Sequence, residues 1–215
     1  MIVLESLFLE SHDLRIFRRM MTCFLLVLLF IPSLDAGWVF GQARFSILPD
    51  SDFRISGRSN ESDFEVSSTE ISGWIELSDA ADPLSVTSLS ITVPSREIKS
   101  DQGLIMNRVM WGSLNVDEHP NISFEMMSAA EPDVVSDSLN LVASGLLTLT
   151  GTTNEVTIEL LAVSGAEGSN RYVGSFPLTM TDYGMTPPTA MFGRLRVHKD
   201  IRIHFDLIFG AATED

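Results

Sequence analysis

The sequence predicts an antiparallel all-β fold with one inserted α-helix, preceded by an N-terminal signal segment. From Phe45 onward, apolar residues recur at every second position in short segments that Gly, Pro, Asn, Asp and Ser separate. This is the pattern of β-strands with one buried face. Between Val93 and Asn121 the apolar period lengthens to that of a helix. The 215 residues are 45% hydrophobic, which is enough for one folded domain with its own core.

Four strands show the clearest alternation between apolar and polar residues. Successive side chains of a strand point to opposite faces, so each of these strands has one buried and one solvated face. The buried positions are Ile122, Phe124 and Met126; Val156, Ile158 and Leu160; Tyr172, Phe176, Leu178 and Met180; and Ile201, Ile203, Phe205, Leu207 and Phe209. Further strands are expected at residues 45–48, 53–57, 63–67, 70–77, 86–93 and 139–149. This gives about nine segments, with residues 45–48 counted separately or merged.

The expected helix carries an apolar stripe and lies between two strands. Ser100 or Asp101 is expected to cap its start, and Gly112 is expected to fray its end. A helix among short antiparallel strands suggests a barrel with a plug or lid, although the stripe can instead dock on the outside of the sheet. Asn107, Arg108 and Asp117 are expected at the solvated rim. The stripe consists of Ile105, Met106, Val109, Met110 and Leu114.

The N-terminal region resembles a signal for export. The run Met20 to Ile31 holds 12 uncharged, mostly apolar residues, which follow Arg15, Arg18 and Arg19 and precede Pro32. A membrane-spanning helix needs roughly 20 such residues, so a permanent span is the weaker alternative. We expect cleavage after Ala43 or Ala36, with Ala43 preferred, and a mature protein that is periplasmic or extracellular.

This interpretation divides the chain into three parts: a signal peptide with its upstream extension (1–43), a β domain (44–209) and a disordered tail (210–215). Cys23, the only cysteine, lies in the signal peptide, so the mature chain is expected to have no disulfide and no cysteine-based metal site.

Charge and motif content exclude several classes of function. The chain has 29 acidic and 14 basic residues, and its net charge of −15 repels polyanions such as nucleic acids. No phosphate-binding loop, nucleophile elbow or metal-binding helix motif is present. The histidines of the mature part, His119, His198 and His204, lack the close spacing of metal ligands. We therefore expect no metal site, no cofactor and no catalytic residues.

Four segments resemble the YceI-like family of lipid- or polyisoprenoid-binding proteins. They are residues 98–124 (IKSDQGLIMNRVMWGSLNVDEHPNISF), 145–156 (GLLTLTGTTNEV), 174–188 (GSFPLTMTDYGMTPP) and 201–209 (IRIHFDLIF). They follow one another in the family's order and span nearly all of the expected mature chain. The stretch from Pro94 to Lys99 departs from the family's usual hydroxyl-rich motif, which we interpret as a difference between subgroups.

The resemblance implies an eight-stranded, lipocalin-like β-barrel that holds an amphiphilic lipid with a long, polyisoprenoid-like tail. A barrel of eight strands is either filled by its own side chains or just wide enough for one small ligand, and the sequence leaves both open. Arg108 is the candidate for contacting a lipid head group. The candidate apolar lining is Met106, Met110, Phe124, Met126, Leu147, Leu149, Phe176, Met180, Ile203 and Phe205.

Two other functions remain open from the sequence alone. The first is an enzyme or stress-response factor with a hydrophobic cleft and residues from the set Asp182, Tyr183, His119 and Arg194. The second is a filled barrel that acts only as an interaction module. A homodimer is plausible if imperfect barrel closure leaves a strand edge exposed.

Overall fold

The computed structural model describes residues 42–130, 139–164 and 168–211. The predicted signal peptide, up to residue 41, and residues 212–215 of the predicted tail lie outside the described residues. Gly210 is a correction, because it ends the last strand and is buried beside Leu48 instead of belonging to a tail. No helix in the described part of the chain is long and apolar enough to cross a membrane.

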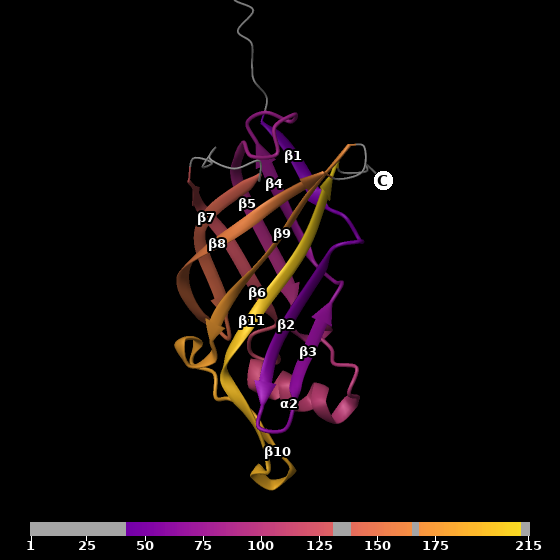
Figure 1. The fold of residues 1–215 in the computed structure, drawn as a ribbon, viewed down its shortest axis with the longest axis vertical. Coiled ribbons are helices and arrows are strands. Elements are labelled where there is room, and N and C mark those ends of the chain that lie inside the picture. The colour runs from indigo at the N-terminus through magenta and orange to yellow at the C-terminus, as the bar shows by residue number, and fades with distance from the viewer. Residues whose placement is uncertain (1–41, 131–138, 165–167, 212–215) are drawn as a thin grey trace, which may run out of the picture. The chain divides into compact units, whose positions relative to one another are not determined.

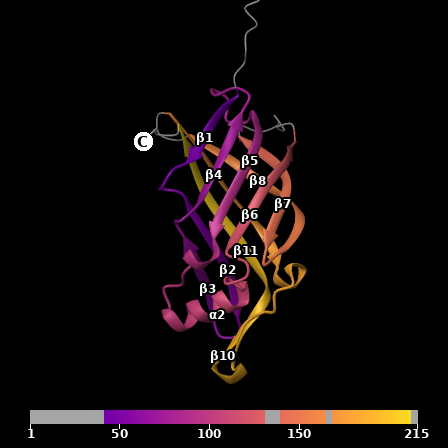
Figure 2. The same ribbon diagram turned by 180° about the vertical axis from the view of Figure 1, so that it is seen from behind.

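Eight antiparallel strands close a barrel, as the resemblance implied (Figures 1 and 2). The circuit closes where β11 pairs with β1 through Ser46–Gly210 and Ile47–Phe209. In circuit order the strands are β1 (Ala43–Ile47), β4 (Ser72–Leu77), β5 (Val86–Pro94), β6 (Asn121–Ala129), β7 (Asn140–Leu149), β8 (Thr152–Ser164), β9 (Ser169–Thr179) and β11 (Leu195–Gly210).

A hairpin outside the eight-stranded circuit extends the wall at the end of the barrel away from β1. Strands β2 (Asp52–Ser59) and β3 (Asp63–Ser68) form this hairpin, and β2 pairs with β11 between Val197 and Asp206. The other edge of β3 has one isolated bridge, from Ser67 to Lys99. A short β10 (Thr189–Ala190) pairs with the beginning of β11. At this end the sheet therefore does not close on itself by strand pairing alone.

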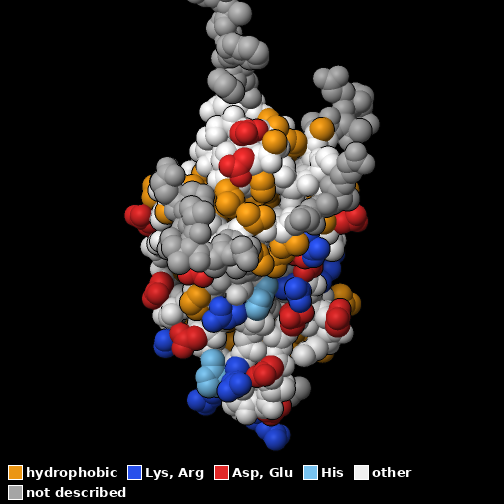
Figure 3. Space-filling model, turned by 45° about the horizontal axis from the view of Figure 1, so that its top comes forward, with side chains coloured by type: hydrophobic (Ala, Val, Ile, Leu, Met, Phe, Trp, Pro, Cys, Tyr) orange, Lys and Arg blue, Asp and Glu red, His pale blue; other side chains and the backbone are white. Residues whose placement is uncertain are grey.

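The alternation read from the sequence is confirmed. Ile203, Phe205, Leu207 and Phe209 are buried, whereas His204 between them is only partly buried and contacts Ser56 on the outer face. Outward positions carry charged side chains of both signs (Figure 3). The inward phase of each strand follows from the period of two in its sequence.

The β1 end of the barrel is filled by side chains. The phenol of Tyr172 donates a hydrogen bond to the Pro83 carbonyl at 2.7 Å and meets the ring of Phe209 edge to face, with 5.9 Å between ring centroids. Burial raises the pKa of Tyr172, so this phenol stays protonated. Ile75, Leu77 and Leu141 complete this close-packed region and are essentially inaccessible to solvent.

The only α-helix in the described residues, α2 (Leu104–Leu114), lies across the opposite end of the barrel (Figures 1 and 2). The expected cap was wrong: the residue before the helix is Gly103, at φ 95°, and no side chain caps it. Glycine accepts this positive φ without a steric penalty. The helix also continues through Gly112 to Leu114 and ends at Asn115 in a left-handed conformation. Short 3-10 helices occur at η1 (Ser95–Glu97), η2 (Met180–Tyr183) and η3 (Met191–Gly193).

Two phenylalanine rings lie against glycines of the neighbouring strand. A Cβ atom at Gly174 would come within 2.4 Å of the Phe205 ring, and one at Gly145 would come within 2.5 Å of the Phe124 ring. Because real Cβ atoms do not approach so closely, the glycines leave space that the rings occupy beside the wall. The two rings therefore take up less of the barrel interior than they would beside larger residues.

We predict that Gly174→Ala destabilises the protein by roughly 1–3 kcal/mol, because its methyl group would also lie 2.5 Å from the Glu159 carbonyl oxygen. Gly112→Ala is the matched control, since nothing lies within 4 Å of its added Cβ. Because alanine is more favourable than glycine in a helix interior, Gly112→Ala should stabilise the protein by up to ~1 kcal/mol. Urea unfolding measures both changes, and a Gly174→Ala midpoint equal to that of the parent protein would contradict the close approach.

Candidate functional site

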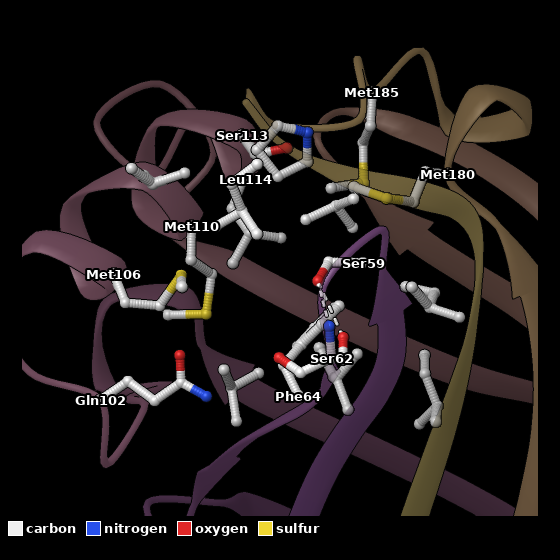
Figure 4. Close-up of a pocket in the computed structure, with 18 of the residues that line it drawn as sticks. Ser59, Ser62, Phe64, Gln102, Met106, Met110, Ser113, Leu114, Met180 and Met185 are labelled. Carbon is white, nitrogen blue, oxygen red and sulfur yellow. Dashed lines mark hydrogen bonds between the residues drawn. The ribbon is translucent and has the colours of Figure 1, made fainter. Parts of the chain in front are cut away.

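An apolar cavity of about 240 Å³ lies at the helix end of the barrel, and we call it the outer cavity (Figure 4). It is enclosed by α2, by the β2–β3 hairpin, by the first half of β11 and by the segment that follows η2. Its apolar lining is Ile55, Phe64, Val66, Met106, Val109, Met110, Leu114, Ile122, Leu149, Met180, Met185, Pro188, Leu195, Val197, Ile201 and Ile203.

Four methionines line the outer cavity from two sides. Met106 and Met110 come from one face of α2, where residues four apart are neighbours. Met180 and Met185 lie on the other side of the cavity (Figure 4). The turn between these two is closed by Gly184 at φ 70° and by a hydrogen bond from the Met185 amide to the Met180 carbonyl. Methionine side chains are flexible, so this lining can adapt its shape.

The polar side chains of the outer cavity lie mainly in the β2–β3 turn. The Ser59 hydroxyl donates to the Ser62 carbonyl and accepts hydrogen bonds from the amides of Glu61 and Ser62. Gln102 and Glu61 are exposed, as is Ser62. The Ser59 hydroxyl is thus already engaged within the turn, as is that of Ser113 on α2, which donates to the Thr186 carbonyl at 3.1 Å. The remaining side chains of the wall are apolar.

A smaller inner cavity of about 60 Å³ lies deeper in the barrel. Ile122 and Ile203 line both cavities, so they stand between the two. Along β11 the inward residues pass from the outer cavity at Ile201, through the inner cavity at Phe205, to the filled end at Phe209. The barrel is therefore filled at the β1 end and hollow at the helix end, which the sequence had left open.

All but one of the predicted lining residues line one or both of these cavities. Met126 lines neither of them; it is half-buried at an irregularity in the β6–β7 pairing. Met106, Met110, Leu149, Met180 and Ile203 line the outer cavity, and Phe124, Leu147, Phe176 and Phe205 join Ile203 in the inner one. The prediction missed Met185, together with Ile55, Phe64 and Val66 of the β2–β3 hairpin. The alternation of Phe64 and Val66 was a usable signal, whereas Met185 follows a turn and has no period.

The apolar stripe of α2 faces the outer cavity and does not dock on the outside of the sheet. Ile105 is a correction, because 79% of it is exposed. Asn107 is also a correction, because it is buried: its side-chain oxygen accepts a hydrogen bond from the Ser100 amide at 2.7 Å. The Trp111 indole donates to the Ile98 carbonyl at 3.0 Å. These two bonds tie α2 to the chain that leads from β5 to the helix.

A polar groove adjoins the outer cavity and contains Arg108, His119 and Tyr183. Val109, Ser113, Met185 and Pro188 line both the groove and the cavity. Arg108 therefore lies beside the apolar site and not within it.

The residues considered for an enzyme do not gather at one place. Asp182 lines a different surface groove with Tyr183, and Arg194 lines neither groove. Burial raises the pKa of Tyr183, partly offset by the neighbouring Asn154 amide. No described residue forms a hydrogen bond with its buried hydroxyl. A protonated tyrosine cannot act as a general base at neutral pH.

Within residues 42–130, 139–164 and 168–211, no three His, Cys, Asp or Glu side chains are placed to hold a metal ion.

We predict that Asn107→Ala destabilises the protein by about 1–3 kcal/mol, because it leaves the buried Ser100 amide without its acceptor. Arg108→Ala is the matched control on the next, exposed position of the helix and should change stability by less than about 0.5 kcal/mol. Thermal and urea unfolding of the two variants tests this. Equal stability of both variants would show that the buried bond does not hold the helix.

Comparison with known proteins identifies the family. A family model described as YceI-like domain matches residues 49–209. A search of curated proteins finds no match. The fold resembles Burkholderia cenocepacia BcnA, with a TM-score of 0.60 and 15% identity over 76% of this chain and 96% of that one.

Two further solved structures share the fold. A polyisoprenoid-binding domain from Saccharophagus degradans, implicated in plant cell wall breakdown, has a TM-score of 0.59 and 10% identity over 80% of this chain and all of its own. A Campylobacter jejuni YceI protein has a TM-score of 0.53 and 13% identity, covering 73% of this chain and 85% of that one. At these identities the structures demonstrate the shared fold, and the family model, which spans most of the chain, shows that this protein belongs to the YceI-like family.

Proposed function

We propose that this protein binds an amphiphilic lipid with a long, isoprenoid-like tail and acts as its carrier, not as an enzyme. The main support for the proposal is the outer cavity, an apolar chamber at the mouth of a barrel that is filled by side chains at its β1 end. The likeness in fold to a domain described as polyisoprenoid-binding supports the same ligand class. The position of the cavity at the end of the barrel provides a route by which a tail can enter.

The energetics favour an apolar tail as the ligand. Each buried CH₂ group contributes about 0.8 kcal/mol, so a tail of a dozen carbons binds without specific polar contacts, less the cost of ordering it. The outer cavity, at about 240 Å³, is slightly smaller than the roughly 300–1,000 Å³ of most small-molecule sites. A long tail would therefore also use the inner cavity, after Ile122 and Ile203 move and the four methionines adapt.

The groove beside the outer cavity is suited to an anionic head group. Arg108 is exposed in this groove and makes no ion pair with any described residue, so its charge is available. His119 lies in the same groove. An amphiphile with its tail below α2 would place its head group near these two side chains, because four residues border both spaces.

The proposed site of action is the periplasm or the extracellular space. The support for export is the apolar run of residues 20–31 and the three arginines before it. A homodimer stays a prediction; the edge of β3, which has one isolated bridge, is the strand edge that pairing of two copies would use.

We predict that Met106→Gln together with Met110→Gln weakens binding of a fluorescent polyprenyl lipid by about tenfold or more. Burying an amide against the apolar tail without a partner costs roughly 1–3 kcal/mol, and 1.4 kcal/mol corresponds to tenfold. Fluorescence titration measures the affinity, and circular dichroism checks that each variant is folded.

Two controls make this experiment specific. Met127→Gln adds the same amide at an exposed position of β6 and should leave affinity unchanged. Met106→Leu with Met110→Leu keeps the lining apolar and should retain most of the affinity. Unchanged lipid affinity in a folded double-glutamine variant would refute a tail bound against α2.

A further inference from the structure

The tip of the hairpin formed by β10 and β11, residues 189–196, exposes a large aromatic side chain. Phe192 is 111% exposed and has the highest exposure of the large hydrophobic residues in the described part of the chain. Its backbone adopts φ 54° and ψ 38°, the left-handed region that bulky residues rarely occupy. Because the Phe192 side chain is fully exposed, packing against the described residues does not offset the cost of this conformation. Such an outlier points to a role outside the folded core.

The charge around this hairpin tip is opposite to that of the whole chain. Residues 184–199 contain Arg194, Arg196 and Lys199 and no acidic residue, although the chain carries a net charge of −15. Lys199 forms an ion pair with Asp200, directly after this segment, at 2.8 Å. Neither Arg194 nor Arg196 forms an ion pair with a described residue. The Arg196 side chain bonds only the Gly193 carbonyl, at 3.0 Å. The hairpin tip therefore combines an exposed aromatic ring with two unneutralised cations.

Helix α2 lies at the same end of the barrel as β10 (Figures 1 and 2), and it exposes two more apolar side chains. Leu104 is 70% and Ile105 is 79% exposed, and both directly precede Met106 of the outer cavity. On the hairpin, Leu195 lines the same cavity between the two free arginines. The outer cavity is thus lined by a residue that lies close in sequence to each of these exposed apolar groups, Met106 on α2 and Leu195 on the hairpin. Glu61 in the β2–β3 turn is an exposed acid at this end.

We propose that this end of the barrel docks on the surface of an anionic lipid bilayer. Phe192 inserts at the boundary between head groups and acyl chains, and Arg194 and Arg196 contact lipid phosphates. Separate protruding apolar side chains flanked by cations match a lipid interface better than a protein interface, which needs a continuous packed patch. Docking in this orientation turns the mouth of the outer cavity toward the membrane. The proposal concerns the surface and holds whether or not the cavity contains a lipid.

Tryptophan fluorescence at the hairpin tip tests the proposal directly. The full chain with Phe192→Trp is mixed with vesicles of phosphatidylglycerol and phosphatidylcholine that contain no polyprenyl lipid. We expect a blue shift of the added emission, after subtraction of the parent spectrum, and quenching by brominated acyl chains. Met127→Trp, an exposed position on β6, is the control and should show neither change. Because Phe192 is fully exposed, its replacement is not expected to disturb folding.

The arginines are tested in the same Phe192→Trp background. Arg194→Gln with Arg196→Gln should reduce the vesicle affinity of the tip by on the order of tenfold with anionic vesicles and leave it unchanged with zwitterionic ones. Arg44→Gln removes one charge from β1, at the opposite end of the barrel, and should have little effect. The proposal is overturned if the emission of the added tryptophan is identical with and without vesicles. It is also overturned if Arg44→Gln reduces the affinity for anionic vesicles as much as Arg194→Gln with Arg196→Gln does. Neither outcome depends on lipid binding in the cavity.

Discussion

The hydrogen bonding of β11 along both of its edges is the constraint on which the structure depends. One edge pairs with β9 from Asp200 to Gly210, and the other pairs with β2 and then with β1. Because a strand can have only two neighbours at any point, β11 must exchange β2 for β1 along its length. The barrel closes by strand pairing where β1 takes over. Where β2 is the neighbour, closure is left to the β2–β3 hairpin and α2.

This exchange of neighbours determines where the barrel is hollow. At the β1 end the rings of Tyr172 and Phe209 pack against each other and are almost completely buried. At the other end, helix α2 covers the interior in place of a strand, and only one face of the helix lines the outer cavity. The wall glycines reinforce this arrangement, since Gly145 and Gly174 let two phenylalanine rings lie close to the strands. A cavity with an opening at one end is what an amphiphile requires, because its tail can be buried while its head group stays hydrated.

Much of the fold was readable from the sequence, and the physical reason is the period of two. Positions such as Ile203 and Phe205 could be assigned to the interior because any other phase would bury His204 and Asp206. The number of strands came from the family resemblance, since alternation alone does not count the strands in a closed circuit. The long reach of β11 to Leu195 was not predicted, because its first part pairs with β2 and β10 and has little buried surface of its own.

The site was less predictable because its geometry depends on contacts that alternation does not encode. Asn107 was placed at the rim as a polar residue, yet it is buried because it satisfies the Ser100 amide. Ile105 was placed on the inward stripe, but its side chain is exposed, whereas that of the next residue, Met106, lines the outer cavity. Arg108 was expected at the solvated rim, and it is exposed in the groove that adjoins the outer cavity.

The proposed function requires that the hollow end of the barrel holds an apolar chain. Native mass spectrometry tests this most directly, using the protein purified without detergent and then incubated with a polyprenyl monophosphate. We expect one bound lipid per chain, either retained from the source or gained on incubation. The bare protein mass in both samples, from a chain shown to be folded, would contradict the proposed function.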